Sequence, residues 1–180
     1  MKRARKVPKA ERRAAFERIV STYEAPLLRY ASRLVRDMDA AQDIVQDAFI
    51  RLFRKWDEEL EPAPRLSSWL YRVVHNRAVD YVRRESRRHA LHMRHAEQSV
   101  AFADPDRGKG FRISAEAEQA VEALHTLSPR EQQVVVLKVY EEKSYKEISE
   151  ITGLSTGNVG YILHHAMRKM AEELKKAQAI

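Results

Sequence analysis

Residues 144–170 read SYKEISEITGLSTGNVGYILHHAMRKM, and this stretch predicts two short helices separated by a tight turn. Ser144 and Glu147 form a capping box, which starts a helix because each residue hydrogen-bonds the backbone of the other. Gly153 suits the left-handed residue that ends this helix, and Ser155 can cap the next one. Two helices joined at this spacing predict a helix-turn-helix.

The outer face of the second helix carries the side chains that would meet DNA. In a helix-turn-helix the first helix braces the second, whose early exposed residues enter the major groove. Hydroxyl and amide groups near a helix start can read base edges, and a basic side chain further on can bind phosphate. The predicted duplex-binding set is Ser155, Thr156, Asn158, Tyr161, His164, His165 and Arg168.

The residues before this stretch continue the helical pattern. Ser128 and Glu131 form a second capping box with Pro129 at the first helical position, and a short amphipathic helix is expected over 114–125. Upstream of it, residues 88–112 lose the pattern and contain the turn-rich run DPDRGKG, which predicts a linker and a domain boundary.

Apolar periodicity is helical in the first half of the chain as well. We expect helices over 14–35 and 43–56 with a short break between them. Two prolines predict a loop at 58–65, and Ser67 or Ser68 can cap a third helix. The predicted fold is all-α, as two small helical bundles joined by a flexible linker, the second containing the helix-turn-helix.

The composition is that of a folded intracellular protein. The 180 residues are 44% apolar and 33% charged, which is enough apolar material to bury real cores. The absence of cysteine excludes a disulfide-stapled scaffold and a cysteine-ligated metal site. No run of about 18 apolar residues is present to span a bilayer, so we expect a cytoplasmic protein without membrane insertion.

Charge is unevenly distributed along the chain. The net charge is +7, from 33 basic and 26 acidic residues, and this balance favours polyanionic partners. Residues 37–61 hold eight acids against three bases, whereas residues 65–94 hold eight arginines against Asp80 and Glu85. The alternation indicates two surfaces with different partners, one of which could bind phosphates.

Two of the predicted helices have polar outer faces. The helix over 43–56 includes Phe53 in its buried apolar stripe, and its outer face carries Asp43, Gln46, Asp47, Ile50, Arg51 and Arg54. The third helix places Trp69 and Tyr81 on its apolar stripe and Tyr71 outward. Its exposed face carries Arg72, Asn76, Asp80, Arg83 and Arg84. Arginines that flank an asparagine suit single-stranded or flipped bases.

Signatures of catalysis are scarce. The sequence has no glycine-rich phosphate loop and no HExxH pair. His89, His92 and His95 are spaced by three, so on a helix they could share a face and bind a metal. A metal-dependent enzyme built on these histidines is one alternative interpretation. Otherwise we predict no catalytic residue, no metal site and no cofactor.

Three blocks of the sequence together resemble a known family. DAAQDIVQDAFIRLF at 39–53 is similar to a core-polymerase-binding helix, and SWLYRVVHNRAVDYVRR at 68–84 to a promoter-melting helix. LSPRE at 127–131, followed by 144–170, is similar to a promoter-reading domain. The family is the extracytoplasmic-function (ECF) group of bacterial RNA polymerase sigma factors, and the blocks occur in the family's order.

The resemblance implies a domain division and a function. Residues 1–13 would be a basic N-terminal extension, 14–88 a sigma region 2-like domain, 89–113 the linker and 114–176 a region 4-like domain. Members of the family bind core RNA polymerase, direct it to specific promoters and promote DNA melting for transcription initiation, and they are not enzymes. The alternative is a stand-alone helix-turn-helix regulator, because 127–170 also resembles the DNA-binding domain of response regulators.

The resemblance also assigns a partner to each face. The outer face that includes Asp43 would bind the β′ clamp helices of the polymerase. The face around Asn76 would bind the minus-ten element, with Asn76 holding a flipped base, and the duplex-binding set would read the minus-thirty-five element. The other partners implied are the β flap of the polymerase and an anti-sigma protein of the kind that often holds ECF sigma factors.

Overall fold

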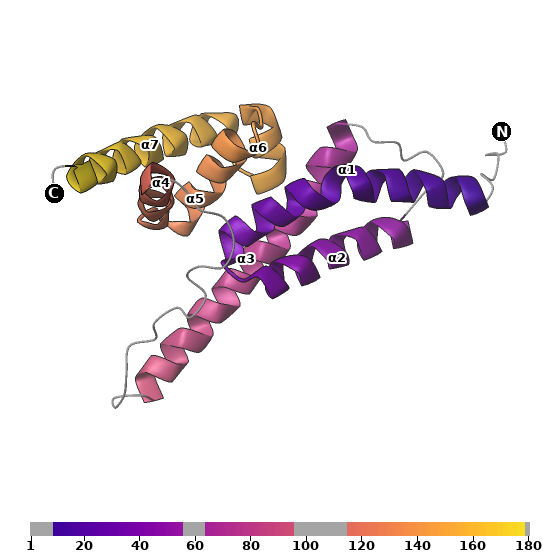
Figure 1. Cartoon of the computed structure of the whole chain (residues 1–180), viewed down its shortest axis with the longest axis horizontal. Coiled ribbons are helices and arrows are strands. Elements are labelled where there is room, and N and C mark those ends of the chain that lie inside the picture. The colour runs from indigo at the N-terminus through magenta and orange to yellow at the C-terminus, as the bar shows by residue number, and fades with distance from the viewer. Residues whose placement is uncertain (1–8, 56–63, 96–114, 179–180) are drawn as a thin grey trace.

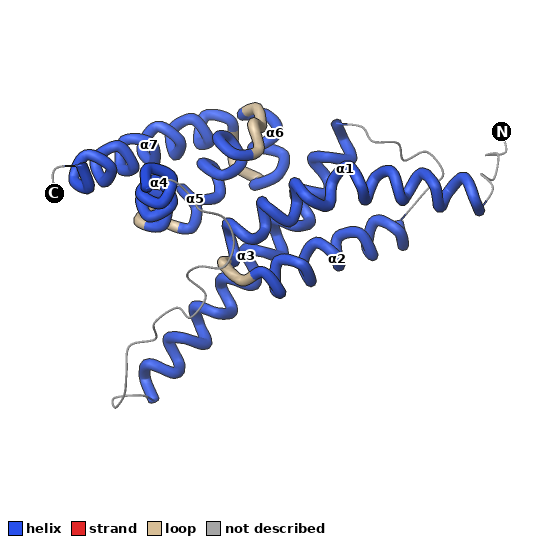
Figure 2. The backbone as a smooth tube through the Cα atoms, viewed as in Figure 1, coloured by secondary structure: helices blue, strands red, loops and turns tan. Residues whose placement is uncertain are grey.

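The computed structural model describes residues 9–55, 64–95 and 115–178, which are helical apart from short turns (Figures 1 and 2). These ranges contain no strand, which confirms the all-α prediction. The first half forms α1 (Lys9–Val35), α2 (Met38–Lys55) and α3 (Pro64–His95). The second half forms α4 (Ala115–His125), α5 (Pro129–Val135), one π-helical turn η1 (Val136–Tyr140), α6 (Tyr145–Thr152) and α7 (Thr156–Gln178).

α3 extends into the segment predicted as a linker. It continues to His95, so the first part of the 89–113 segment is helical. The rest of that segment lies outside the described residues, as do residues 1–8 of the basic extension. α1 begins at Lys9, so the other part of the extension is the first turn of a helix.

The N-terminal bundle consists of α1, α2 and α3 packed around one apolar core. Its fully or nearly fully buried side chains include Ile19, Leu27, Tyr30, Ala48, Leu52, Leu70, Val74 and Ala78. Within each helix these residues recur three, four or eight positions apart, which places them on one face. The apolar stripes predicted from periodicity therefore account for most of this core.

α3 begins earlier than expected. Ser67 and Ser68 lie inside the helix, so the prediction that one of them caps it is wrong. Pro64 starts the helix instead, because its φ is already helical and the first helical position needs no N–H donor. The loop predicted at 58–65 is therefore wrong for its last two residues, and residues 58–63 lie outside the described ranges.

A short turn at Arg36 and Asp37 joins α1 to α2. Arg36 adopts a left-handed φ of 57°, and Asp37 Oδ1 accepts a hydrogen bond from the backbone N–H of Ala40 at 3.0 Å. This cap starts α2 at Met38, before the expected position 43. Asp37 Oδ2 also accepts a hydrogen bond from the Tyr81 hydroxyl at 3.0 Å, which ties the turn to α3.

Both predicted capping boxes are confirmed in the C-terminal bundle of α4 to α7. The Ser128 hydroxyl accepts a hydrogen bond from the backbone N–H of Glu131 at 3.4 Å, and the Glu131 carboxylate accepts one from the backbone N–H of Ser128 at 2.9 Å. Ser144 and Glu147 make the same two contacts at 3.2 and 2.8 Å. The starts of α5 and α6 are therefore encoded locally.

The turn of the helix-turn-helix also matches its prediction. Gly153 ends α6 with a left-handed φ of 75°. Ser155 Oγ accepts a hydrogen bond from the backbone N–H of Asn158 at 3.2 Å and so caps α7. The two helices are thus separated by the tight, capped turn that the sequence predicts.

The two bundles pack directly against each other (Figure 1). α1 contacts α5 and η1, and α3 contacts α6. The four consecutive residues Val134–Leu137 are almost completely buried, because this segment packs on α7 within its own bundle and on α1 of the other. A helical segment that is apolar on all sides requires cover on all sides, and α1 of the N-terminal bundle covers the side that α7 leaves open.

Candidate polymerase and nucleic-acid interfaces

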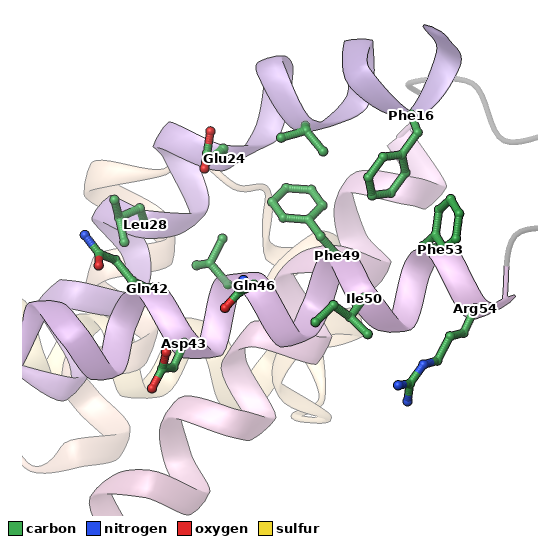
Figure 3. Close-up of a pocket in the computed structure, with 12 residues that line it drawn as sticks. Phe16, Glu24, Leu28, Gln42, Asp43, Gln46, Phe49, Ile50, Phe53 and Arg54 are labelled. Atoms are coloured by element: carbon green, nitrogen blue, oxygen red, sulfur yellow. The ribbon is translucent and has the colours of Figure 1, made fainter. Parts of the chain in front are cut away.

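An apolar groove runs between α1 and α2 on the outside of the N-terminal bundle (Figure 3). Its volume is about 650 Å³, and its apolar walls include Phe16, Val20, Leu28, Val45, Phe49 and Phe53. Four residues of the predicted outer face of α2 also line it, namely Asp43, Gln46, Ile50 and Arg54. An apolar surface with a polar rim of this kind typically binds another macromolecule.

Phe53 is more accessible than its place in the apolar stripe predicts. Its side chain is 53% exposed, and Ile50, one turn away, is 42% exposed. On one side, the Phe53 ring packs edge-on against the Phe16 ring, with the ring centres 5.3 Å apart. On the other side it faces the groove. The prediction of burial is wrong because α1 flanks this position without covering it.

Asp47 and Arg51, the other two residues of the predicted outer face, interact within the bundle. Asp47 Oδ2 accepts hydrogen bonds from Arg51 Nε at 2.9 Å and from Arg77 Nε at 3.0 Å. Arg77 belongs to α3, so this carboxylate links the two helices. The three side chains are 39–43% exposed, so the ion pairs stabilise the fold only weakly. Sequence spacing alone does not show that Arg77 pairs with Asp47.

The predicted single-strand-binding face lies on α3 and is accessible. Arg72, Asn76, Asp80, Arg83 and Arg84 are all exposed. Three of them, Asn76, Asp80 and Arg83, line a cleft of about 600 Å³ together with Pro129, Arg130 and Gln133 of α5. The face is therefore open to solvent but bounded on one side by the C-terminal bundle.

The position predicted for Tyr71 of α3 from helical spacing is wrong. It is predicted to point outward, but it is only 2% exposed, and its hydroxyl donates a hydrogen bond to Glu141 Oε2 at 2.6 Å. Burial, together with the Glu141 carboxylate, raises the pKa of Tyr71 far above its usual range, so the hydroxyl keeps its proton. Trp69 and Tyr81 are half-buried against the core.

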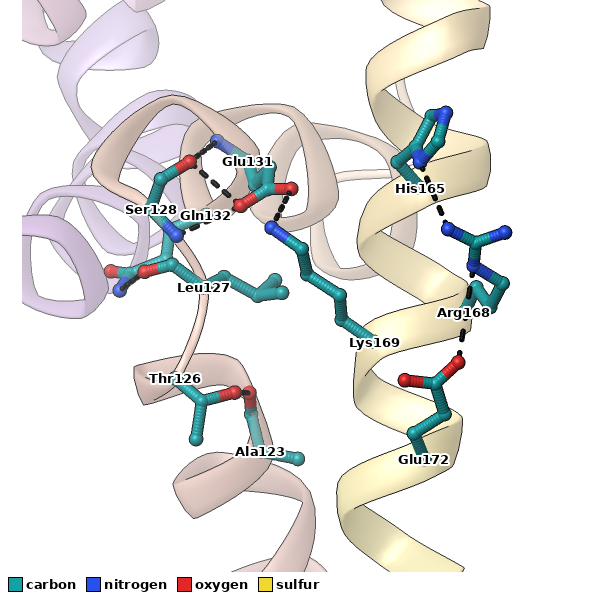
Figure 4. Close-up of polar contacts among 10 residues, drawn as sticks. All are labelled: Ala123, Thr126, Leu127, Ser128, Glu131, Gln132, His165, Arg168, Lys169 and Glu172. Atoms are coloured by element: carbon teal, nitrogen blue, oxygen red, sulfur yellow. Dashed lines mark hydrogen bonds and ion pairs between the residues drawn. The ribbon is translucent and has the colours of Figure 1, made fainter.

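The predicted duplex-binding face of α7 is largely exposed. Ser155, Thr156, Asn158, Tyr161, His164 and Arg168 are exposed, and His165 is half-buried. The centres of the His165 and Tyr161 rings lie 4.4 Å apart. His165 Nδ1 is 3.4 Å from Arg168 Nη2 (Figure 4). Polar side chains in the middle of α7 thus contact one another along the helix, whereas the first turn presents its hydroxyl and amide groups outward.

α7 is anchored to α5 through Lys169. Lys169 Nζ donates a hydrogen bond at 2.7 Å to Oε1 of Glu131, whose side chain is 12% exposed (Figure 4). Burial alone would raise the pKa of Glu131, but hydrogen bonds from Lys169 and Ser128 lower it to about 2. A charged contact therefore holds the helix that presents the duplex-binding set.

The described side chains include no group of three histidine, aspartate or glutamate residues placed to hold a metal ion. His89, His92 and His95 lie in α3, but their side chains are outside the described part of the structure. No helix within the described ranges is long and apolar enough to cross a membrane.

Each of the two bundles matches a known protein family. The family descriptions "Sigma-70 region 2" and "Sigma-70, region 4" match residues 19–88 and 117–170. The RNA polymerase sigma-E factors of Streptomyces avermitilis and Streptomyces coelicolor are each 32% identical to this chain, with 89% and 88% of the chain and 85% of each relative covered. The ECF RNA polymerase sigma factor SigW of Bacillus subtilis is 27% identical over 97% of this chain and 96% of its own length.

Solved structures show the same fold. The sigma factor RpoE from Bartonella quintana, in complex with the anti-sigma factor NepR, has a TM-score of 0.67 at 22% identity and covers 89% of this chain and 96% of its own. CnrH, in complex with the cytosolic domain of CnrY, has a TM-score of 0.65 at 22% identity, covering 91% and 90%.

A region 2 bundle followed by a region 4 helix-turn-helix defines the class of sigma-70-type transcription factors. Within that class, the chain belongs to the ECF RNA polymerase sigma factors, which direct RNA polymerase to promoters. A stand-alone helix-turn-helix regulator is not favoured, because it leaves the region 2 match over 19–88 without a role.

Proposed function

We propose that three surfaces of this sigma factor each bind a different partner. The groove between α1 and α2, with its rim of Asp43, Gln46, Ile50 and Arg54, binds the β′ clamp helices of core polymerase. Exposed apolar side chains inside a polar rim support this assignment, since protein interfaces centre on such anchors. Asp47 and Arg51 contribute at the edge of the same surface, where they also hold Arg77.

The exposed face of α3 binds the non-template strand of the minus-ten element. Asn76 hydrogen-bonds a flipped base, while Arg72, Arg83 and Arg84 follow the phosphate backbone. The free energy of trapping unstacked bases shifts the duplex toward the open state, so the protein promotes melting without covalent chemistry of its own. The observation that carries this proposal is the row of exposed polar side chains on α3.

The duplex-binding set of α7 reads the minus-thirty-five element, and the C-terminal bundle also contacts the β flap. Residues 14–88 and 114–176 act as the two functional domains, joined by the linker at 89–113. The protein works in the cytoplasm, where polymerase and promoter DNA are found. An anti-sigma protein is a further expected partner, because the related solved structures RpoE and CnrH are complexes with NepR and CnrY.

Run-off transcription with purified core polymerase on a promoter library tests the proposal. Ile50→Ser and Phe53→Ser should each weaken core binding by about tenfold or more, since a buried apolar anchor is lost from the interface. Met38→Ser is the matched control, because Met38 is also on α2 and 54% exposed but lies outside the groove. Failure of the wild-type protein to bind core, or equal losses in all three variants, would contradict the assignment.

A further inference from the structure

The first part of α7 contains no lysine, arginine, aspartate or glutamate. Residues 156–167 read TGNVGYILHHAM, and the first arginine of the helix, Arg168, lies about 18 Å from its start at about 1.5 Å per residue. The commonest specific contact in a major groove, an arginine or lysine bound to guanine, is therefore not available in these turns. The exposed or half-buried groups that remain are the side chains of Thr156, Asn158, Tyr161, His164 and His165.

Three of these side chains are rings that lie next to one another on one face of the helix. Tyr161 and His165 are four positions apart, and their ring centres lie 4.4 Å apart. The His164 ring meets the His165 ring edge-on, with the centres 5.9 Å apart. Tyr161 is 64% exposed, so its ring stands out from the surface of the helix. We call Tyr161, His164 and His165 the ring cluster.

Polar contacts further along α7 orient the ring cluster. His165 Nδ1 accepts a hydrogen bond from Arg168 Nη2 at 3.4 Å, since a guanidinium can only donate (Figure 4). Arg168 Nε in turn lies 3.9 Å from Oε1 of Glu172. The His165 ring is therefore oriented from behind while it packs on Tyr161. A ring that is already held loses less conformational entropy when it binds.

The backbone beside the Tyr161 ring is open. Gly157 lies one turn before Tyr161 and is exposed. Among the described residues, and apart from the adjoining helix backbone, nothing lies within 4 Å of the place where its Cβ would be. The corresponding place at Gly160 meets the Tyr145 ring of α6 at 3.4 Å, so that side of α7 packs on its own bundle. DNA can therefore approach the α7 backbone closely at Gly157, next to the exposed ring.

We propose that the ring cluster recognises the C5-methyl group of a thymine in the minus-thirty-five element. This methyl group marks thymine in the major groove, where apolar side-chain atoms bind it. The Tyr161 ring offers an apolar face of the required kind, and the His165 ring supports it. Asn158, one turn earlier, suits adenine, so α7 reads A·T pairs both by hydrogen bonds and by the methyl group. This inference rests on the proposed binding of α7 to the minus-thirty-five element.

Deoxyuridine tests this contact, because it lacks the methyl group of thymine and keeps every hydrogen-bonding group. The promoter library first selects the minus-thirty-five sequence, in which at least one A·T pair should be fixed. Each thymine of the element is then replaced singly, and binding of the closed promoter by the holoenzyme is measured at low temperature. At one or two positions deoxyuridine should lower the affinity about fourfold, which is the effect of one buried methyl group.

Four variants assign the effect to particular side chains. Tyr161→Ser should bind the thymine and deoxyuridine promoters equally, because the ring is lost. Tyr161→Phe removes only the hydroxyl and should keep the fourfold difference, whereas His165→Ala removes the support of the ring and should give an intermediate one. Asn158→Ala is the matched control, since it should weaken binding to both DNAs and keep their ratio.

The outcomes separate this inference from the proposed function. A wild-type holoenzyme that depends on the minus-thirty-five sequence but binds every deoxyuridine promoter as tightly as the thymine promoter would overturn the inference alone. The same holds for a selected element without a fixed A·T pair, and for a fourfold difference that survives in Tyr161→Ser. A holoenzyme that is indifferent to the minus-thirty-five sequence would instead contradict the proposed function of α7 itself.

Discussion

The hydroxyl oxygen of Tyr30 lies 2.8 Å from Nδ1 of His75, in the interior of the N-terminal bundle. Tyr30 is completely buried and His75 is 5% exposed, so this hydrogen bond links α1 and α3 where water is excluded. Asn76, the next residue, is exposed. A buried polar pair specifies how one helix is turned against another, and here it sets the direction in which Asn76 and the predicted single-strand-binding face of α3 point.

The same pair predicts acid sensitivity. Burial, followed by the positive charge of Arg130, lowers the pKa of His75 to about 4. The unfolded chain binds this proton at about pH 6.5 and the folded protein only near 4, so stability should fall as the pH decreases through that window, by up to about 3 kcal/mol. Urea unfolding from pH 7 to 4 measures the slope.

His75→Gln should flatten this pH dependence, whereas His164→Gln, at an exposed position, should keep it. A wild-type slope in the His75→Gln protein would assign the acid sensitivity to another group.

Two glycines should respond to alanine in opposite directions. At Gly160 the added Cβ meets only the Tyr145 ring, at an ordinary 3.4 Å, so Gly160→Ala should stabilise the protein by about 0.5–1 kcal/mol through helix propensity. Gly153 has a φ of 75°, so Gly153→Ala should cost about 1 kcal/mol although the space is open. Thermal unfolding distinguishes the two, and a loss of stability at both positions would mean that α7 tolerates no Cβ at 160.

Asn76→Ala should impair promoter opening and spare polymerase binding. Losing hydrogen bonds to a flipped base should lower open-complex formation by about tenfold or more. Permanganate reactivity of unpaired thymines measures opening, and copurification measures core binding. Asn158→Ala is the matched control, since it should weaken closed-duplex binding and leave the opening step of bound promoters unchanged. Parallel loss of core binding in Asn76→Ala would show that the residue is structural.

The capping box of α6 predicts a pH-dependent mutational effect. Ser144→Ala should cost about 1 kcal/mol at neutral pH. Hydrogen bonds from the Ser144 side chain and backbone lower the pKa of Glu147, so their stabilisation is present above the carboxyl's unfolded pKa and disappears as the pH falls below it. The difference between Ser144→Ala and wild type should therefore shrink in acid. Ser21→Ala, within α1, should be neutral at every pH.

Local signals predicted the helix-turn-helix accurately. Ser144, Gly153 and Ser155 act through hydrogen bonds and backbone angles within a few residues of themselves, so their roles can be inferred without knowledge of the rest of the fold. The exposure of Asn76 and Asn158 followed from helical periodicity for the same reason. Their binding roles remain predictions.

Contacts between distant segments were not predictable in this way. Tyr71 looks outward by spacing, but the Tyr30 ring of α1, with its centre 5.4 Å away, and Glu141, 70 positions later, both lie against it. Phe53 fits an apolar stripe, but its exposure depends on where α1 runs. Arg77 is one of several arginines on α3 until Asp47 of α2 is placed beside it.

The order of residues along the chain therefore determined where helices start and stop and which side of each is apolar, because these properties depend on neighbours one or two turns away. Only the tertiary structure decided that the two bundles close on each other and that a glutamate in a charged turn is buried between them. The burial of a side chain depends on what packs against it from elsewhere in the chain, and periodicity carries no information about that.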